Sequence, residues 1–172
     1  MKKLLLIFLS LFCLICVGCT DSSSVNEVKV MFDAPSYAGI SPEELVNKEG
    51  EPESKDNFTH KISKGKFDLE VYSYTKDKYY IEYEFYKNKL VRIHHFANDP
   101  HDYTEYSGNP RDIIKMFGIE PGEDIEETAN TGESYRYCDV TDAVVDFWVT
   151  GVDVEADKSF QTVYITYDMT CF

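Results

Sequence analysis

The sequence predicts an α+β protein made of two repeated units, each a short helix followed by a three-stranded antiparallel meander, behind a cleaved signal peptide. Three observations support this fold class. A basic and then apolar segment opens the chain, apolar and polar residues alternate with a period of two in several later segments, and one helix-start pattern occurs twice, 68 residues apart.

The N-terminal segment has the composition of a secretion signal. Lys2 and Lys3 are followed by an almost unbroken apolar run over 4–17, and Gly18 precedes a cysteine and a serine-rich stretch. The apolar run is shorter than the roughly 20 residues that a membrane-spanning helix needs. We therefore expect residues 1–18 to be removed, and residues 19–30 to form a polar tether.

The junction Cys16-Val17-Gly18-Cys19 resembles the lipobox of bacterial lipoproteins. The resemblance implies cleavage before Cys19, a diacylglyceryl thioether on its sulfur, labelling with palmitate, and a lipid-anchored location on the extracytoplasmic side of the cell membrane. Two acyl chains anchor a protein stably. One position departs from the pattern, because Cys16 stands where lipoproteins usually have leucine. The alternative is an ordinary signal peptide with incidental cysteines.

Composition limits the classes of partner. The whole chain has a net charge of −14, and removing residues 1–18 takes away two lysines and no acid, which leaves −16. Such a surface repels nucleic acid, so we expect no nucleic-acid partner. The aromatic content of 15% argues against disorder.

The cysteines divide between the predicted signal peptide and the mature chain. Cys13 and Cys16 leave with the signal and Cys19 takes the lipid, so Cys138 and Cys171 remain. Outside the cytoplasm these two can form a disulfide. The alternative is two small buried thiols.

The first repeat unit is expected over 31–98. Ser41 is a suitable N-cap, Pro42 suits the first helical position, Glu44 can close a capping box, and Gly50 provides a left-handed stop. Three strands follow, because apolar and polar residues alternate in each of them. They are expected over 67–72, 79–86 and 91–95, with lysine-flanked turns at 76–78 and 87–89.

The second unit is expected over 109–172, after a linker at 99–108. Asn109, Pro110, Ile113 and Gly118 stand 68 residues after Ser41, Pro42, Leu45 and Gly50 and have matching roles. Its strands are expected over 135–139, 144–150 and 162–167. Units of this size bury little apolar surface alone, so we expect the two to pack together, either as one continued sheet or around a shared interface.

Tandem helix-plus-meander units in a secreted protein resemble the beta-lactamase inhibitor protein fold. A single such unit behind a lipid anchor resembles the small lipoprotein of the outer-membrane assembly machine, and residues 41–52 are similar to the short-helix, Gly-x-Pro opening of both. Phage lipoproteins that exclude superinfecting phage are similar in plan. Those families often have two helices per unit, whereas one is evident here. The resemblance implies protein binding through an exposed sheet face, without catalysis.

A polar and aromatic face of the meanders is the strongest candidate surface. Tyr, Trp and Arg dominate the energetics of protein interfaces. The candidates are Tyr72, Tyr74, Tyr80, Tyr86, Arg92, Arg136, Trp148 and Tyr164, accompanied by the acids Glu82, Glu84 and Asp146. The alternative is that these tyrosines are ordinary strand residues that pair across the sheet.

A histidine-rich segment suggests metal ligands, but strand geometry counts against them. It contains His94, His95, Asp99, His101 and Asp102. Neighbouring residues of a strand point to opposite faces, so His94 and His95 cannot share one ion. We predict no metal, no cofactor and no catalytic residue.

The function expected from the sequence is that of a lipid-anchored, non-catalytic module of the cell envelope. Its partners would be the membrane, through the N-terminal lipid, and an unidentified envelope or secreted protein. Two alternatives stay open: a phage-derived superinfection-exclusion or enzyme-inhibitor lipoprotein, and a metal- or small-ligand-binding lipoprotein.

Overall fold

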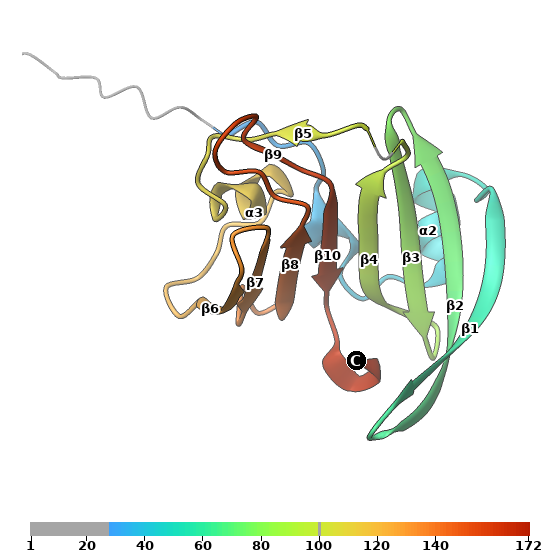
Figure 1. Ribbon diagram of the computed structural model, residues 1–172. Coiled ribbons are helices and arrows are strands. Elements are labelled where there is room, and N and C mark those ends of the chain that lie inside the picture. Colours follow the sequence, from blue (N-terminus) through green and yellow to red (C-terminus); the bar gives the residue numbers. More distant parts are fainter. Residues whose placement is uncertain (1–27, 100) are drawn as a thin grey trace, which may run out of the picture.

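One antiparallel sheet of eight strands organises the computed structural model, which describes residues 28–99 and 101–172 (Figure 1). The strands lie in the order β1-β2-β3-β4-β10-β8-β7-β6, and each pairs antiparallel with its neighbours. A few short helices accompany this antiparallel sheet, so the fold is α+β. The predicted signal peptide, Cys19 and most of the predicted tether lie outside the described residues.

Each half of the sheet is a four-stranded meander. The first half contains β1 (Ser54–Ile62), β2 (Gly65–Lys76), β3 (Tyr79–Tyr86) and β4 (Lys89–Ala97). The second contains β6 (Glu126–Asn130), β7 (Ser134–Cys138), β8 (Asp146–Thr150) and β10 (Thr162–Thr166). Strands β4 and β10 pair at the centre, with Ile93 opposite Ile165. Of the two packing modes expected from the sequence, the structure has the continued sheet.

The two outermost strands, β1 and β6, were not predicted from the sequence. Strand β1 is largely exposed on both of its faces, and β6 is exposed at every position. An edge strand with no buried face has no alternation of apolar and polar residues, so the period-two pattern cannot reveal it. Each half therefore has four strands where three were expected.

Helix α2 (Pro42–Glu49) begins as predicted. Ser41 Oγ accepts the backbone N–H of Glu44, and the Glu44 carboxylate accepts the backbone N–H of Ser41 at 2.8 Å. This reciprocal pair satisfies two N–H groups that the first helical turn leaves without partners. At the other end Gly50 has φ +87°, a conformation that favours glycine.

Helix α3 (Asp112–Met116) is shorter than its counterpart and begins later than predicted. Asn109 caps the turn before it, because its side-chain oxygen accepts the backbone N–H of Arg111 at 3.1 Å. Gly118 ends the helical segment at φ +69°, and a Cβ there would lie 3.3 Å from the backbone of Asp33. The close approach of the two chain segments explains the need for glycine at this position.

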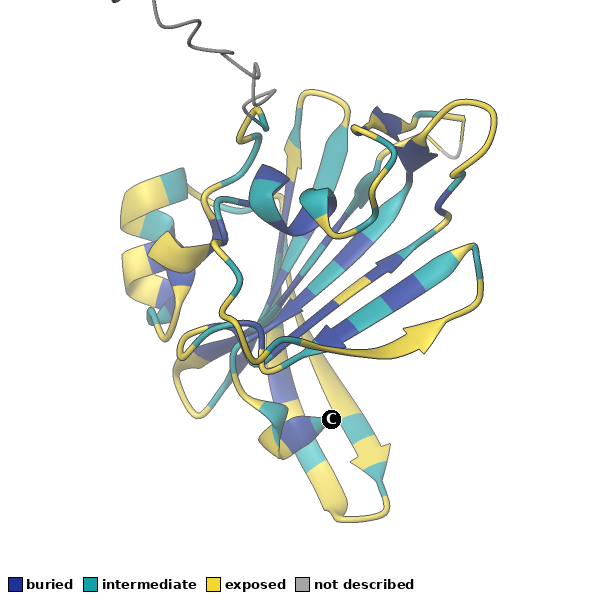
Figure 2. Ribbon diagram, turned by 90° about the vertical axis from the view of Figure 1, so that its left-hand side faces the viewer, coloured by how far each residue is buried: buried dark blue, intermediate teal, exposed yellow. Residues whose placement is uncertain are grey.

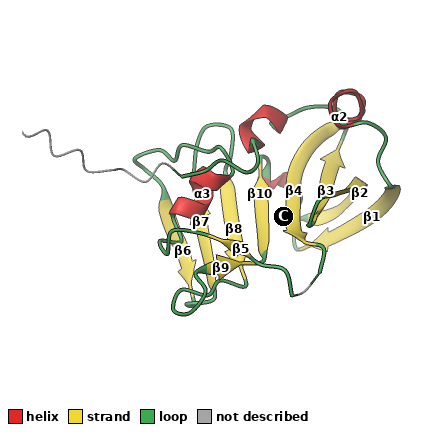
Figure 3. Ribbon diagram, turned by 90° about the horizontal axis from the view of Figure 1, so that it is seen from above, coloured by secondary structure: helices red, strands yellow, loops and turns green. Residues whose placement is uncertain are grey.

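The main core lies between the sheet and the helices, which pack on one of its sides (Figure 3). Phe117, just after α3, contacts Phe147 of β8 at a centroid distance of 5.7 Å. On the first half, Tyr37 of the turn η1 (Ala34–Tyr37) packs on Tyr83 of β3. Buried positions alternate with less buried ones along the central strands (Figure 2). One core therefore spans both halves.

The N-terminal part of the described chain belongs to the folded body. Val28 packs against the core, and the Met31 N–H donates to the carbonyl of Met116 at 2.8 Å. The predicted linker at 99–108 is also partly structured, since it contains β5 (Thr104–Glu105), which pairs with β9 (Ser159–Phe160). No helix within the described residues is long and apolar enough to cross a membrane.

A smaller apolar cluster lies on the other side of the sheet, at the C-terminus. The turn η2 (Met169–Cys171) brings Cys171 against Leu69 of β2 and Val91 of β4. Phe172 packs against the same cluster. The last residues of the chain thus cover apolar side chains that would otherwise face solvent.

The capping box of α2 gives a stability prediction. Ser41→Ala removes the acceptor for the Glu44 N–H, so it should lower the free energy of unfolding by about 1 kcal/mol. The control Ser41→Asp keeps an oxygen acceptor at the cap and should stay close to the wild type. Urea denaturation of the three proteins measures the difference, and equal midpoints for Ala and wild type would contradict the assigned role.

Candidate functional site

The sheet face opposite α2 and α3 carries a connected set of aromatic and charged side chains. We call it the open face. It comprises Tyr80, Glu82, Glu84 and Tyr86 of β3, Arg92, His94 and Phe96 of β4, Tyr164 of β10, Asp146 and Trp148 of β8, and Arg136 of β7. These residues share one face because they pair directly across neighbouring strands.

Aromatic rings form a row across the middle of the open face. Trp148 stacks on Tyr164 with a centroid distance of 5.0 Å, and Tyr164 stacks on His94 at 4.2 Å. Phe96 continues the row from His94 at 4.5 Å and contacts Tyr80 at 5.0 Å. The stacked rings cover one another's faces, so they present mainly edges to a partner. The row is therefore a ridge rather than a flat stacking platform.

An ion pair and a histidine–carboxylate contact hold side chains of this row in place. Arg136 Nε donates to Asp146 Oδ1 at 2.6 Å, and its guanidinium lies 5.8 Å from the Trp148 ring centroid. The hydrogen bond to Asp146 raises the pKa of Arg136. In the middle of the row His94 Nδ1 lies 3.3 Å from a carboxylate oxygen of Glu82. Because these partners are held by strand pairing, the ridge is ordered before any ligand arrives.

A second polar pair lies beside the C-terminus. Arg92 Nε donates to Thr166 Oγ1 at 3.1 Å, and its guanidinium lies over the Phe172 ring at 3.2 Å from the centroid. Its neighbour Glu84 has one buried carboxylate oxygen without a hydrogen-bond partner among the described residues. Burial raises the pKa of Glu84, while Arg92 and His94 act in the opposite direction.

Two predicted face residues lie on the other side of the sheet. Tyr74 is only 5% exposed and donates its hydroxyl to the carbonyl of Gly50 at 3.0 Å. Tyr72 packs on Phe85 in the core at 5.3 Å. With Tyr72 and Tyr74 on the polar face, the alternation over 67–72 predicts that Leu69 points toward the core. Leu69 is instead buried by the C-terminal cluster on the open side, which reverses the expected orientation of the strand.

The two remaining cysteines are free thiols in separate places. Cys138 lies on β7, where its sulfur is 3.5 Å from Asp146 Oδ1. Cys171 is buried in the C-terminal cluster beside β2 and β4. Strands β8 and β10 lie between β7 and β4, so the structure does not join the two sulfurs.

The histidine-rich segment is divided among three environments. His94 lies on the open face and His95 lies in the core. His101 is exposed in a loop, where its backbone N–H donates to Asp99 Oδ1. Asp102 lies in the same loop. In the described part of the chain, no three side chains of the ligand-forming types converge on one point.

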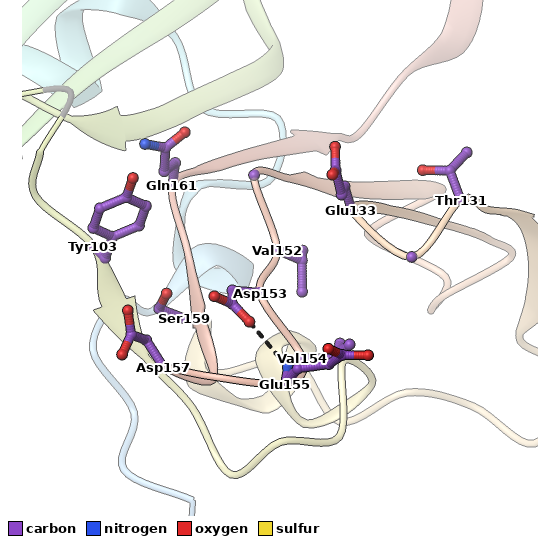
Figure 4. A pocket seen from close by; sticks show the side chains of 12 residues that line it. Tyr103, Thr131, Glu133, Val152, Asp153, Val154, Glu155, Asp157, Ser159 and Gln161 are labelled. Carbon is purple, nitrogen blue, oxygen red and sulfur yellow. Dashed lines mark hydrogen bonds between the residues drawn. The ribbon is translucent and has the colours of Figure 1, made fainter.

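A hollow between loops of the second half shares no lining residue with the open face; Figure 4 shows its lining side chains. It has a volume of about 650 Å³ and lies beside β9, where Tyr103, Val154 and several acids line it. Asp153 accepts the backbone N–H groups of Ala156 and Glu155, which lower its pKa. This carboxylate is therefore occupied in shaping its own loop.

Comparison with known proteins gives no family. The chain matches no protein-family model and no curated protein. Among solved structures it is similar to a cysteine-rich secretory protein from Staphylococcus aureus, with 13% identity, a TM-score of 0.45, and coverage of 81% of this chain and 48% of that one. It is also similar to an extracellular protein containing an SCP domain from Bacillus anthracis, with 17% identity, a TM-score of 0.41, and coverage of 78% and 45%. The chain spans slightly less than half the length of these proteins.

His95 should make stability depend on pH. It is 3% exposed between Phe117 and Tyr79, and burial lowers its pKa to about 4. In the unfolded chain a histidine has a pKa of about 6.5, so between these values the unfolded state binds a proton that the folded state excludes. The free energy of unfolding should therefore fall as the pH drops from about 6.5 to 4, by up to about 3 kcal/mol from this group.

Denaturant unfolding at several pH values measures this dependence. His95→Phe should flatten the slope in that window, because the proton-binding group is gone. The control Tyr79→Phe keeps the histidine and should keep the wild-type slope. If His95→Phe and wild type lose stability in parallel, other groups cause the acid sensitivity.

Proposed function

We propose that this protein is a lipid-anchored, non-catalytic module that binds another protein through the open face, on the extracytoplasmic side of the cell membrane. The observation that carries the proposal is the ordered ridge of that face. The open face as a whole carries most of the residues predicted for binding: Tyr80, Tyr86, Arg92, Arg136, Trp148 and Tyr164.

A protein partner fits this face better than a small ligand does. The ridge runs across four strands without forming an enclosed cavity, and Trp148 remains 37% exposed although its indole N–H donates to Ser134 Oγ at 2.7 Å. Exposed Trp and Tyr edges flanked by arginines are typical of interface hot spots. Small ligands are usually held in concave sites.

The N-terminal sequence supports the anchor. Val28 packs against the core, and residues 20–27 stand between it and Cys19 in the sequence. A fully extended tether over this stretch reaches about 30 Å. It would leave the body free to turn its open face toward a partner at the membrane or beyond it.

In-cell crosslinking followed by mass spectrometry tests the binding role. The wild type should capture a specific protein, and Tyr80→Ala combined with Trp148→Ala should reduce that capture at least tenfold. Both side chains lie at the surface of the ridge, so we expect the double variant to fold.

A matched control separates the open face from general surface effects. Tyr103→Ala combined with Val154→Ala removes two exposed apolar side chains at the hollow beside β9, and it should capture as the wild type does. Thermal unfolding verifies that both variants are folded. Equal capture by the two double variants would rule out the open face as the binding surface.

The anchor is tested separately at Cys19. Cys19→Ala should abolish incorporation of labelled palmitate and release the processed chain from the membrane fraction, because the thioether needs this sulfur. Cys138→Ala is the control and should label normally. A Cys19→Ala chain that still labels and sediments with membranes would contradict lipidation at this residue.

A further inference from the structure

The β1–β2 hairpin extends beyond the rest of the sheet. Strand β1 pairs with β2 as far as Ile62 opposite Gly65, but β3 pairs with β2 only from Glu70 onward. We call residues 58–69 the hairpin arm. Figures 1 and 2 show it at the lower end of the molecule, away from the point where the described chain begins. At about 3.3 Å per residue, the five unpaired residues of β2 extend it by about 16 Å.

The tip of the arm concentrates positive charge. Residues 58–67 contain Lys61, Lys64, Lys66 and His60, and no acid. The side chains of Lys61 and Lys66 lie directly opposite each other in the hairpin register. Like charges at directly opposed positions destabilise a hairpin. This arrangement therefore carries a cost for the folded protein.

No ion pair of the described chain offsets this cost, and Asp68, the acid of the arm, instead accepts the hydroxyl of Thr59 at 2.7 Å. The ion pairs within residues 28–99 and 101–172 join Lys55 to Glu51, Lys76 to Glu49, Arg136 to Asp146 and His94 to Glu82. The three lysines of the tip are exposed and have no such pair. The chain has 31 acids, yet these three lysines form no ion pair with those in the described part of the chain. They can therefore pair with an anionic group of another molecule.

The negative charge of the body is largely screened at the tip of the arm. The arm extends about 16 Å past the edge of β3, whereas charges are largely screened beyond about 8 Å at physiological ionic strength. The negative net charge thus does not cancel the local field of the three lysines. An anionic group that approaches the tip from outside meets cations first.

We propose that the hairpin arm binds the repeated anionic groups of a linear polymer, such as a polyphosphate-like or phosphodiester chain, in the cell envelope. Lys61 and Lys66 hold one anionic group between them, and Lys64 contacts the next. A repeated anion fits because several charges lie within a few residues. Flexible lysines bind phosphate as point charges and need no fixed geometry.

A polymer is favoured over a bilayer surface by the position of the arm. Its tip lies at the opposite end of the body from the point where the described chain begins (Figures 1 and 2). This step rests on the proposed lipid anchor, because a tether of about 30 Å keeps the start of the described chain near the membrane and makes the tip the more distant end of the body. The open face contributes no residue to the arm, so the two binding proposals are independent.

Fluorescence anisotropy with labelled inorganic polyphosphate tests the proposal. The full chain is kept soluble in a non-ionic amphipol, which works whether or not Cys19 is lipidated. Binding at 50 mM salt should weaken as salt rises, with a slope of about −2 in log K against log salt for three lysines. Lys61→Ser, Lys64→Ser and Lys66→Ser together should reduce the affinity at least tenfold.

The control changes the same number of charges elsewhere. Lys29→Ser, Lys78→Ser and Lys158→Ser leave the arm intact and should keep the wild-type affinity. In the unbound protein Lys66→Glu should raise the melting temperature, because an ion pair replaces the repulsion with Lys61. Equal affinity of the two triple variants would overturn the proposal.

A vesicle-flotation assay distinguishes binding to a polymer from binding to a membrane. Phosphatidylglycerol vesicles are floated with the same proteins at the same salt. We expect little more flotation with these vesicles than with phosphatidylcholine vesicles. Stronger binding to the vesicles than to polyphosphate would show that the hairpin arm binds the bilayer surface instead of a polymer. Failure to bind polyphosphate leaves the palmitate and crosslinking results unaffected, so the failure of one proposal can be told from that of the other.

Discussion

The pairing of β4 with β10 is the contact on which the rest of the structure depends. Ile93 and Ile165 face each other at its centre, and both are fully buried. Burying side chains of this size stabilises by about 1.5–3 kcal/mol each. Without this pairing each half would have one more exposed strand edge and a smaller core. With it, Tyr164 stacks on His94 across the junction, and the open face becomes continuous between the halves.

The period of two along β4 explains how one strand serves two environments. His95 faces the core between Phe117 and Tyr79, where it is held neutral, while His94 faces outward and meets Glu82. Two adjacent residues of the same type thus have unrelated roles. A shift of β4 by one residue against its neighbours would exchange them and turn the buried Ile93 toward the open face.

Much of the fold could be predicted because its signals are local. The capping box of Ser41, the glycine at position 50 and the alternation within β3 and β4 each depend on a few neighbouring residues. The face on which Tyr72 and Tyr74 lie was predicted wrongly because it depends on a distant part of the chain. Apolar side chains lie on both faces of β2, and only the C-terminal turn, about a hundred residues later, decides that Leu69 is covered on the open side. The edge strands β1 and β6 have no buried face, so no pattern in them marks a strand.

Net charge was a poor guide to the local surface. The acidity of the whole chain argues against polyanionic partners at long range, but salt screens that argument beyond about 8 Å. The fold then separates the charges, because Lys61 and Lys66 are brought opposite each other only by the register of a hairpin whose first strand the sequence does not reveal. An expectation about partners that is drawn from composition therefore applies to the average surface, and the proposed binding at the hairpin arm concerns an element that projects from the body by more than a screening length.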